Sequence, residues 1–344
     1  MKKPSILLRS LSSRLSTRLA PSPAVAPWPP VRSAYDRWLA AELDELRAGP
    51  LAAPYCASAA WLARALGFAS AAQRRLVAST SAAPGVAGAC IDRKSADECV
   101  EDTAELLDAC AGLRDRLEMI SGYVSSMRVA LHWLEGCGGG AVVTARRRAA
   151  AAFVECEAVV RRCGAELAKC GSNLRKLGER ALTHAKQQHG DTQRDEALAG
   201  ARAAALLAIG ALGAALAFRP RRAVSVGVAP PGNKSGGAPW ECALQEVQKQ
   251  LKEEYERRRK EGVPCMAELD AAAAAGRTVQ RAVAAGRQCP DSAVAAARRR
   301  CDELEEKVFV LDEKVGELHR ELIGVRMVLL EWSQTARGHQ LLKL

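Results

Sequence analysis

The residue types best suited to metal binding or covalent chemistry in this sequence are twelve cysteines and five histidines. Zinc sites usually draw on close pairs such as CxxC, but the closest cysteines here, Cys156, Cys163 and Cys170, are seven residues apart. On a helix that spacing separates Cα atoms by about 10 Å, beyond the limit of about 7 Å for a disulfide. The spacing predicts reduced core side chains in a protein that is not secreted.

The histidines form no metal-binding or catalytic pattern, with no HExxH motif and no pair four residues apart. We therefore predict no catalytic residue, no metal site and no cofactor, and we expect no small-molecule ligand. The rival hypothesis is an enzyme acting on a carotenoid-like or lipid metabolite inside the protein. It requires ionisable groups among the regularly spaced apolar residues that would form the protein's interior. The three long apolar patterns of this sequence, described below, contain no such group.

The composition favours helices over sheets. The chain is 49% hydrophobic but only 4% aromatic, and much of its apolar content is alanine, the best helix former and a poor strand residue. Runs of alternating β-branched residues are almost absent. These features exclude a sandwich, a barrel and a parallel α/β sheet.

Apolar residues recur at alternating spacings of three and four in three segments, Cys99–Leu134, Cys156–Ala181 and Val294–Trp332. A period of 3.5 residues held over several heptads requires packing against other long helices. We predict an all-α protein, an elongated antiparallel helical bundle with long coiled-coil-like helices. Shorter helices are expected over 33–48 and 55–80, with turns at Gly136–Gly140, Gly262–Pro264 and Cys289–Asp291.

The predicted organisation is a leader over 1–32, one half of the bundle over 33–218, a linker over 219–240, C-terminal helices over 241–337 and a tail over 338–344. The leader carries six of the eleven net positive charges of the chain and no acidic residue. Its Arg- and Ser-rich composition is typical of an organelle transit peptide, so plastid targeting is one prediction. A disordered basic tail is the alternative.

The segment 203–218 contains sixteen uncharged residues bounded by arginines. As a helix it would span about 24 Å, short of a hydrocarbon thickness of about 30 Å. The segment is therefore interpreted either as a single membrane-spanning helix or as a buried core helix. Membrane association is expected if it spans. The candidate membrane residues are Ala203, Leu206, Leu207, Ile209, Leu212, Leu216 and Phe218, flanked by Arg202, Arg219, Arg221 and Arg222.

Basic clusters at Arg146–Arg148, Arg257–Lys260 and Arg298–Arg300 give the body its remaining positive character. Acidic residues accompany them, as in Asp302, Glu303 and Glu305, which is typical of solvated helix faces. Nucleic-acid binding would require a basic face with interleaved aromatic residues, which this chain lacks. We predict no nucleic-acid partner, and the charged faces of the final helix are the candidate surfaces for protein contacts.

The stretch Cys99–Gly136, with its Leu106-Leu107-Asp108-Ala109-Cys110 core, resembles the plant BYPASS-like family. The weak apolar segment followed by a Pro/Gly linker and the final helix over Leu311–Trp332 are similar to that family too. The resemblance runs from about residue 33 to the end, and the chain departs from the family in its alanine content and its leader. It implies a non-enzymatic developmental regulator, acting through protein contacts, that restrains a root-derived mobile signal. Some relatives look like exocyst partners, so a membrane-tethered adaptor of the exocyst or secretory machinery is the alternative.

Overall fold

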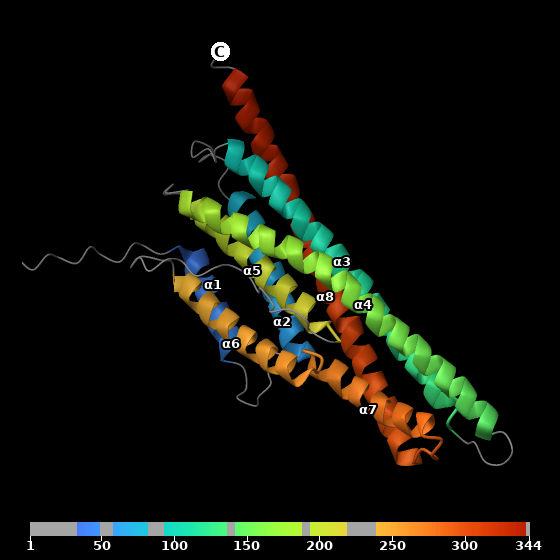
Figure 1. Cartoon of the computed structure of the whole chain (residues 1–344). Helices are drawn as coiled ribbons and strands as arrows, with labels where there is room; N and C mark the ends of the chain where they lie inside the picture. Colours follow the sequence, from blue (N-terminus) through green and yellow to red (C-terminus); the bar gives the residue numbers. More distant parts are fainter. Residues whose placement is uncertain are drawn as a thin grey trace, which may run out of the picture. The chain divides into compact units, whose positions relative to one another are not determined.

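All regular structure within the residues described is helical. The computed structural model describes residues 33–48, 58–81, 93–135, 142–187, 193–218 and 239–341, so the leader and most of the predicted linker lie outside the described residues. The helices, shown in Figure 1, are α1 (Ala34–Arg47), α2 (Ala59–Ser81), α3 (Arg93–His132), α4 (Val142–Gln187), α5 (Gln193–Ala215), α6 (Pro239–Glu261), α7 (Ala267–Ala284) and α8 (Asp291–Leu341). The predicted all-α class is confirmed.

The predicted apolar seams are the buried faces of the long helices. In α8 the seam is buried at each position from Val294 to Leu329, and Trp332 at its end is half-buried. In α3 the seam is buried from Cys99 to Leu131, and Leu134 is half-buried just beyond the helix. In α4 the side chains of Cys156, Cys163 and Leu177 are buried, while Val160 is half-buried.

Ion pairs fix the direction in which α3 and α8 run against each other. Arg114 Nε lies 3.0 Å from Asp312 Oδ1, and Arg128 Nη2 lies 2.6 Å from Asp302 Oδ1. Residue numbers rise along α3 while those of their partners fall along α8, so the two helices are antiparallel. On the other flank of α8, Arg74 of α2 lies 3.0 Å from Glu317 and 2.9 Å from Glu321.

Capping contacts explain where several helices begin and end. The predicted helix over 55–80 begins at Ala59 because the Ser58 hydroxyl accepts a 3.2 Å hydrogen bond from the backbone N–H of Trp61. After α7, Gly286 has a φ of 66°, and the Arg287 N–H donates to the Ala282 carbonyl at 3.0 Å. This left-handed cap ends α7 before the predicted turn at 289–291.

Two predicted boundaries differ from the observed helix ends. α6 begins at Pro239 rather than at residue 241, since proline is compatible with the first turn of a helix. α8 continues to Leu341, past the predicted boundary at 337. A single glycine such as Gly338 lowers helix propensity without ending a helix, and no proline follows it.

Candidate functional site

The predicted membrane residues lie in α5 and in the three residues that follow it, and all of them are buried. Ala203, Leu206, Leu207, Ile209, Leu212, Leu216 and Phe218 are each at most 7% exposed. The stretch Ala197–Ala215 is long and apolar enough to span a membrane, and 78% of its apolar window is buried inside the protein. α5 contacts α1, α2, α3, α4 and α6, so its apolar side chains meet other helices on every side.

Polar groups of the surrounding elements bind the backbone of α5 along its length. The donors are Gln73 Nε2 to Ala201 O at 2.7 Å, Tyr255 Oη to Ala211 O at 2.7 Å, Arg116 Nη1 to Gly213 O at 3.5 Å, Met266 N to Ala215 O at 3.2 Å and Cys163 Sγ to Leu216 O at 3.5 Å. Lipid tails have no hydrogen-bond donors, whereas neighbouring helices do. In this structure the segment is buried among other helices.

The flanking Arg202 lies inside the protein rather than at its surface. Its Nη1 lies 2.9 Å from Asp102 Oδ2, with side chains 12% and 4% exposed, and its Nη2 donates to Cys99 Sγ at 2.9 Å. Burial raises the pKa of the Cys99 thiol above its ordinary value. Sequence reasoning missed Asp102, although it directly precedes the seam position Thr103. The other flanking residues, Arg219, Arg221 and Arg222, lie outside the described residues.

The described cysteines are free thiols, and most of them are buried. Desolvation by burial raises the pKa of Cys156 and Cys265 to about 12 and that of Cys301 to about 11. A thiol in such surroundings stays protonated at neutral pH and is a poor nucleophile and metal ligand. Among the described residues no group of three or more His, Cys, Asp or Glu could hold a metal ion.

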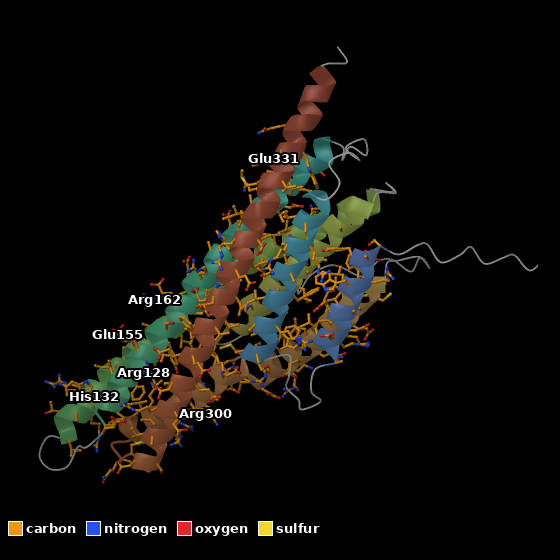
Figure 2. The ribbon with its side chains drawn as sticks, turned by 180° about the vertical axis from the view of Figure 1, so that it is seen from behind. Arg128, His132, Glu155, Arg162, Arg300 and Glu331 are labelled. Atoms are coloured by element: carbon orange, nitrogen blue, oxygen red, sulfur yellow. The ribbon has the colours of Figure 1, made fainter. Side chains whose placement is uncertain are left out.

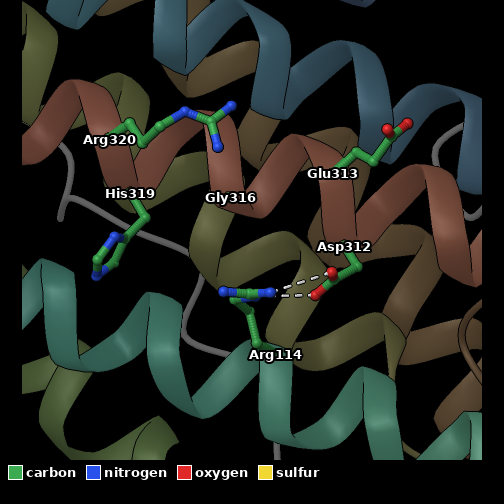
Figure 3. Close-up of a pocket in the computed structure, with 6 residues that line it drawn as sticks. All are labelled: Arg114, Asp312, Glu313, Gly316, His319 and Arg320. Atoms are coloured by element: carbon green, nitrogen blue, oxygen red, sulfur yellow. Dashed lines mark hydrogen bonds and ion pairs between the residues drawn. The ribbon is translucent and has the colours of Figure 1, made fainter.

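A surface pocket of about 350 Å³ lies over the outer side of α8, close to α3 (Figure 3). It is lined by Arg114, Asp312, Glu313, Gly316, His319 and Arg320. Asp312 and His319 are half-buried, and Glu313 and Arg320 are exposed. The pocket is therefore open to the surface of the described chain.

Exposed apolar side chains line the same outer side of α8. Phe309 is 63% exposed, Ile323 44% and Met327 56%. With Glu313, Gly316 and Arg320 they follow each other at spacings of four and three, so they share one face. We call Phe309, Glu313, Gly316, Arg320, Ile323 and Met327 the outer stripe. In Figure 2 the α8 ribbon is uncovered along most of its length.

Sequence reasoning identified the charged faces of α8 as a contact surface but missed the apolar members of this stripe. The sequence does contain a pattern that could have found them, because Phe309, Ile323 and Met327 fall outside the heptad positions of the buried seam. A second set of large apolar residues at heptad spacing, offset from the first, indicates a second packing face.

The predicted basic clusters are paired with nearby groups. Arg257 Nη2 lies 2.7 Å from Glu254, Arg298 Nη2 lies 2.6 Å from Glu135, and Arg300 Nη1 lies 2.7 Å from Glu303. The guanidinium of Arg148 lies 4.3 Å from the ring centroid of Trp133, a cation–π contact. Each cluster thus contributes to contacts within the chain.

A comparison with protein-family models finds no match, and comparisons with curated proteins and with solved structures find none either.

Proposed function

We propose that this chain is a non-enzymatic plant developmental regulator of the BYPASS-like kind, which acts through protein contacts and restrains a root-derived mobile signal. The resemblance of Cys99–Gly136 and Leu311–Trp332 to that family supports the developmental role. We further propose that its long helices form an elongated antiparallel bundle, with α3 and α8 as its coiled-coil-like pair.

The outer stripe of α8 is the observation that carries the proposal of protein contacts. Isolated apolar side chains on a surface are ordinary, but large ones aligned along one helix face with charges between them are typical of a helix-packing surface. The stripe extends over eighteen residue steps, from Phe309 to Met327, or about 27 Å along the helix. Such a length suits packing against another helix.

The roles of the buried polar groups support a non-enzymatic reading. Gln73, Arg116 and Tyr255 bind carbonyls of α5, and Arg202 is paired with Asp102. These hydrogen bonds and this ion pair hold α5 in its place, and they determine how the side chains are oriented. We therefore assign them to the stability of the fold.

Reciprocal grafting of plants that lack the protein tests the developmental role. We expect a shoot to arrest when it is grafted on a root without the protein, whatever the genotype of the shoot. A wild-type root should restore growth of a mutant shoot. Normal shoots on roots that lack the protein would contradict the proposed function.

The alternative is a membrane-tethered adaptor of the exocyst, with 203–218 as its anchor. Tethering of this kind would require α5 to leave Gln73, Tyr255 and the other donors that bind it. We therefore propose that α5 is a core helix in the cell as well, and we expect carbonate extraction to release the intact chain into the soluble fraction. Retention in the membrane pellet that is lost on deletion of 203–218 would favour the anchor.

A further inference from the structure

The outer stripe of α8 has a symmetry that bears on the identity of its partner. Phe309 and Ile323 lie seven residues before and seven residues after Gly316. Glu313 lies three residues before this glycine and Arg320 four residues after it. Apolar residues thus flank the glycine at equal distances, and opposite charges flank it at nearly equal distances.

This arrangement is complementary to itself when one copy is turned by 180°. In a two-fold symmetric contact each residue on one side of the axis meets a residue on the other side of it in the partner. With the axis beside Gly316 and the two helices antiparallel, Glu313 of each copy faces Arg320 of the other. Phe309 of each copy faces Ile323 of the other, so two ion pairs and two apolar contacts form together.

The charges needed for this contact are available at the surface. Glu313 and Arg320 are both exposed, and among the described residues neither has an ion partner within the chain. Figure 3 shows them projecting to the same side of α8 from either side of Gly316. By contrast Asp312 is paired with Arg114 at 3.0 Å, and Glu317 with Lys314 at 2.8 Å.

Gly316 leaves the middle of the outer stripe without a side chain. A glycine inside a helix costs about 1 kcal/mol relative to alanine. A Cβ atom at position 316 would meet only Arg320 Nη1, at an ordinary contact distance of 3.7 Å. Because no side chain is present at this position, a second helix has room to approach α8 closely here, over the pocket of about 350 Å³.

At each end of the contact the same axis brings two carboxylates towards each other. Asp302 would come opposite Glu331, about 22 Å from the axis along the helix. Asp302 is already paired with Arg128 at 2.6 Å, which reduces repulsion between these carboxylates. Helices that cross at an angle also diverge with distance from the crossing point.

We propose that two copies of this chain associate through the outer stripe of α8, antiparallel and with the two-fold axis beside Gly316. The proposal rests on the proposed role of this stripe in protein contact and names a second copy of the chain as the partner. Because the contact is a single helix pair rimmed by charges, we expect an equilibrium between monomer and dimer that depends on concentration.

Sedimentation velocity of the purified full chain between roughly 1 and 100 µM tests the proposal. We expect the wild type to approach twice the chain mass of 36.7 kDa as the concentration rises. Glu313→Arg and Arg320→Glu each place two like-charge pairs in the contact. Each variant alone should raise the dissociation constant roughly tenfold or more.

The decisive experiment is sedimentation of a mixture of the two variants. A Glu313→Arg chain and an Arg320→Glu chain restore both ion pairs when they meet, so the mixture should dimerise like the wild type. Matched controls on the exposed face of α4 are Glu155→Arg and Arg162→Glu (Figure 2), which change the net charge equally. Neither control should alter the dissociation constant.

Three outcomes would overturn the dimer. These are a wild type that stays at single-chain mass throughout, single variants that dimerise like the wild type, and a mixture of variants that fails to recover. A monomeric wild type would assign the stripe to a different protein and would leave the grafting test of the developmental role untouched.

Discussion

At the scale of single residues, the ion pair between Asp102 and Arg202 places two opposite charges in the interior of the protein. Two charges are removed from water there, with side chains 4% and 12% exposed and a separation of 2.9 Å. Such a pair adds little net stability, but removal of one partner leaves a buried charge without compensation. The pair also joins the beginning of α3 to α5.

Replacement of the buried carboxylate by Asp102→Ala should therefore lower the free energy of unfolding by about 3–5 kcal/mol. The double variant Asp102→Leu/Arg202→Met should recover most of that loss, since neither charge is left behind. Urea denaturation followed by circular dichroism measures both. As a control, Glu45→Gln breaks the exposed pair with Arg64, 2.7 Å long, and should cost less than about 1 kcal/mol. Equal losses from Asp102→Ala and Glu45→Gln would contradict this account.

Replacement of glycine by alanine should have opposite effects on stability at two positions. A Cβ atom at Gly200 of α5 would lie 2.6 Å from Leu39 Cδ2 and 3.3 Å from Tyr35 Cε1, so Gly200→Ala should destabilise the fold by about 1–3 kcal/mol. Gly122 of α3 is exposed and has nothing within 4 Å of the added atom, so Gly122→Ala should stabilise it by up to about 1 kcal/mol. Thermal unfolding of both variants measures these effects, and a Gly200→Ala variant that is no less stable than the wild type would refute the packing of α5 against α1.

At the scale of elements, α5 illustrates what sequence patterns leave open. A run of sixteen uncharged residues satisfies a membrane and a protein core alike, because both environments select against charge. The contacts that distinguish a core helix from a membrane helix come from residues far away in the sequence. Gln73 lies 128 residues before its acceptor in α5, and Tyr255 lies 44 residues after its acceptor in the same helix. No local pattern in 203–218 records them. The seams of α3 and α8 were predictable because a heptad period is a local signal.

A charge placed in α5 should therefore disrupt the whole fold. Leu207 is fully buried, and an ammonium group there has no partner, so Leu207→Lys should cost several kcal/mol and lower the yield of folded protein. Val129→Lys, at a site that is 51% exposed on α3, is the matched control and should change stability by no more than about 0.5 kcal/mol. The melting temperatures of the two variants give the comparison. Similar values would show that α5 is not the core.

At the scale of the whole molecule, α8 connects the fold to the proposed function. One face of this helix is the buried seam that organises α2, α3 and α7, and the opposite face is the outer stripe. Sequence analysis found the first face and placed protein contacts on the charged surface of the same helix. It did not separate Phe309, Ile323 and Met327 from the core, since exposure depends on which neighbours surround a helix. The family resemblance supplied the developmental role, which no packing argument provides.

The most direct test of the central claim, that this protein acts through contacts made by the outer stripe, is genetic rescue. Plants that lack the protein would receive the wild type, Phe309→Asp/Met327→Asp, or the control Val143→Asp/Val154→Asp on exposed sites of α4. With equal protein levels on immunoblots, we predict that the wild type and the control restore shoot growth and that the stripe variant does not. Full restoration of shoot growth by the stripe variant would contradict the account.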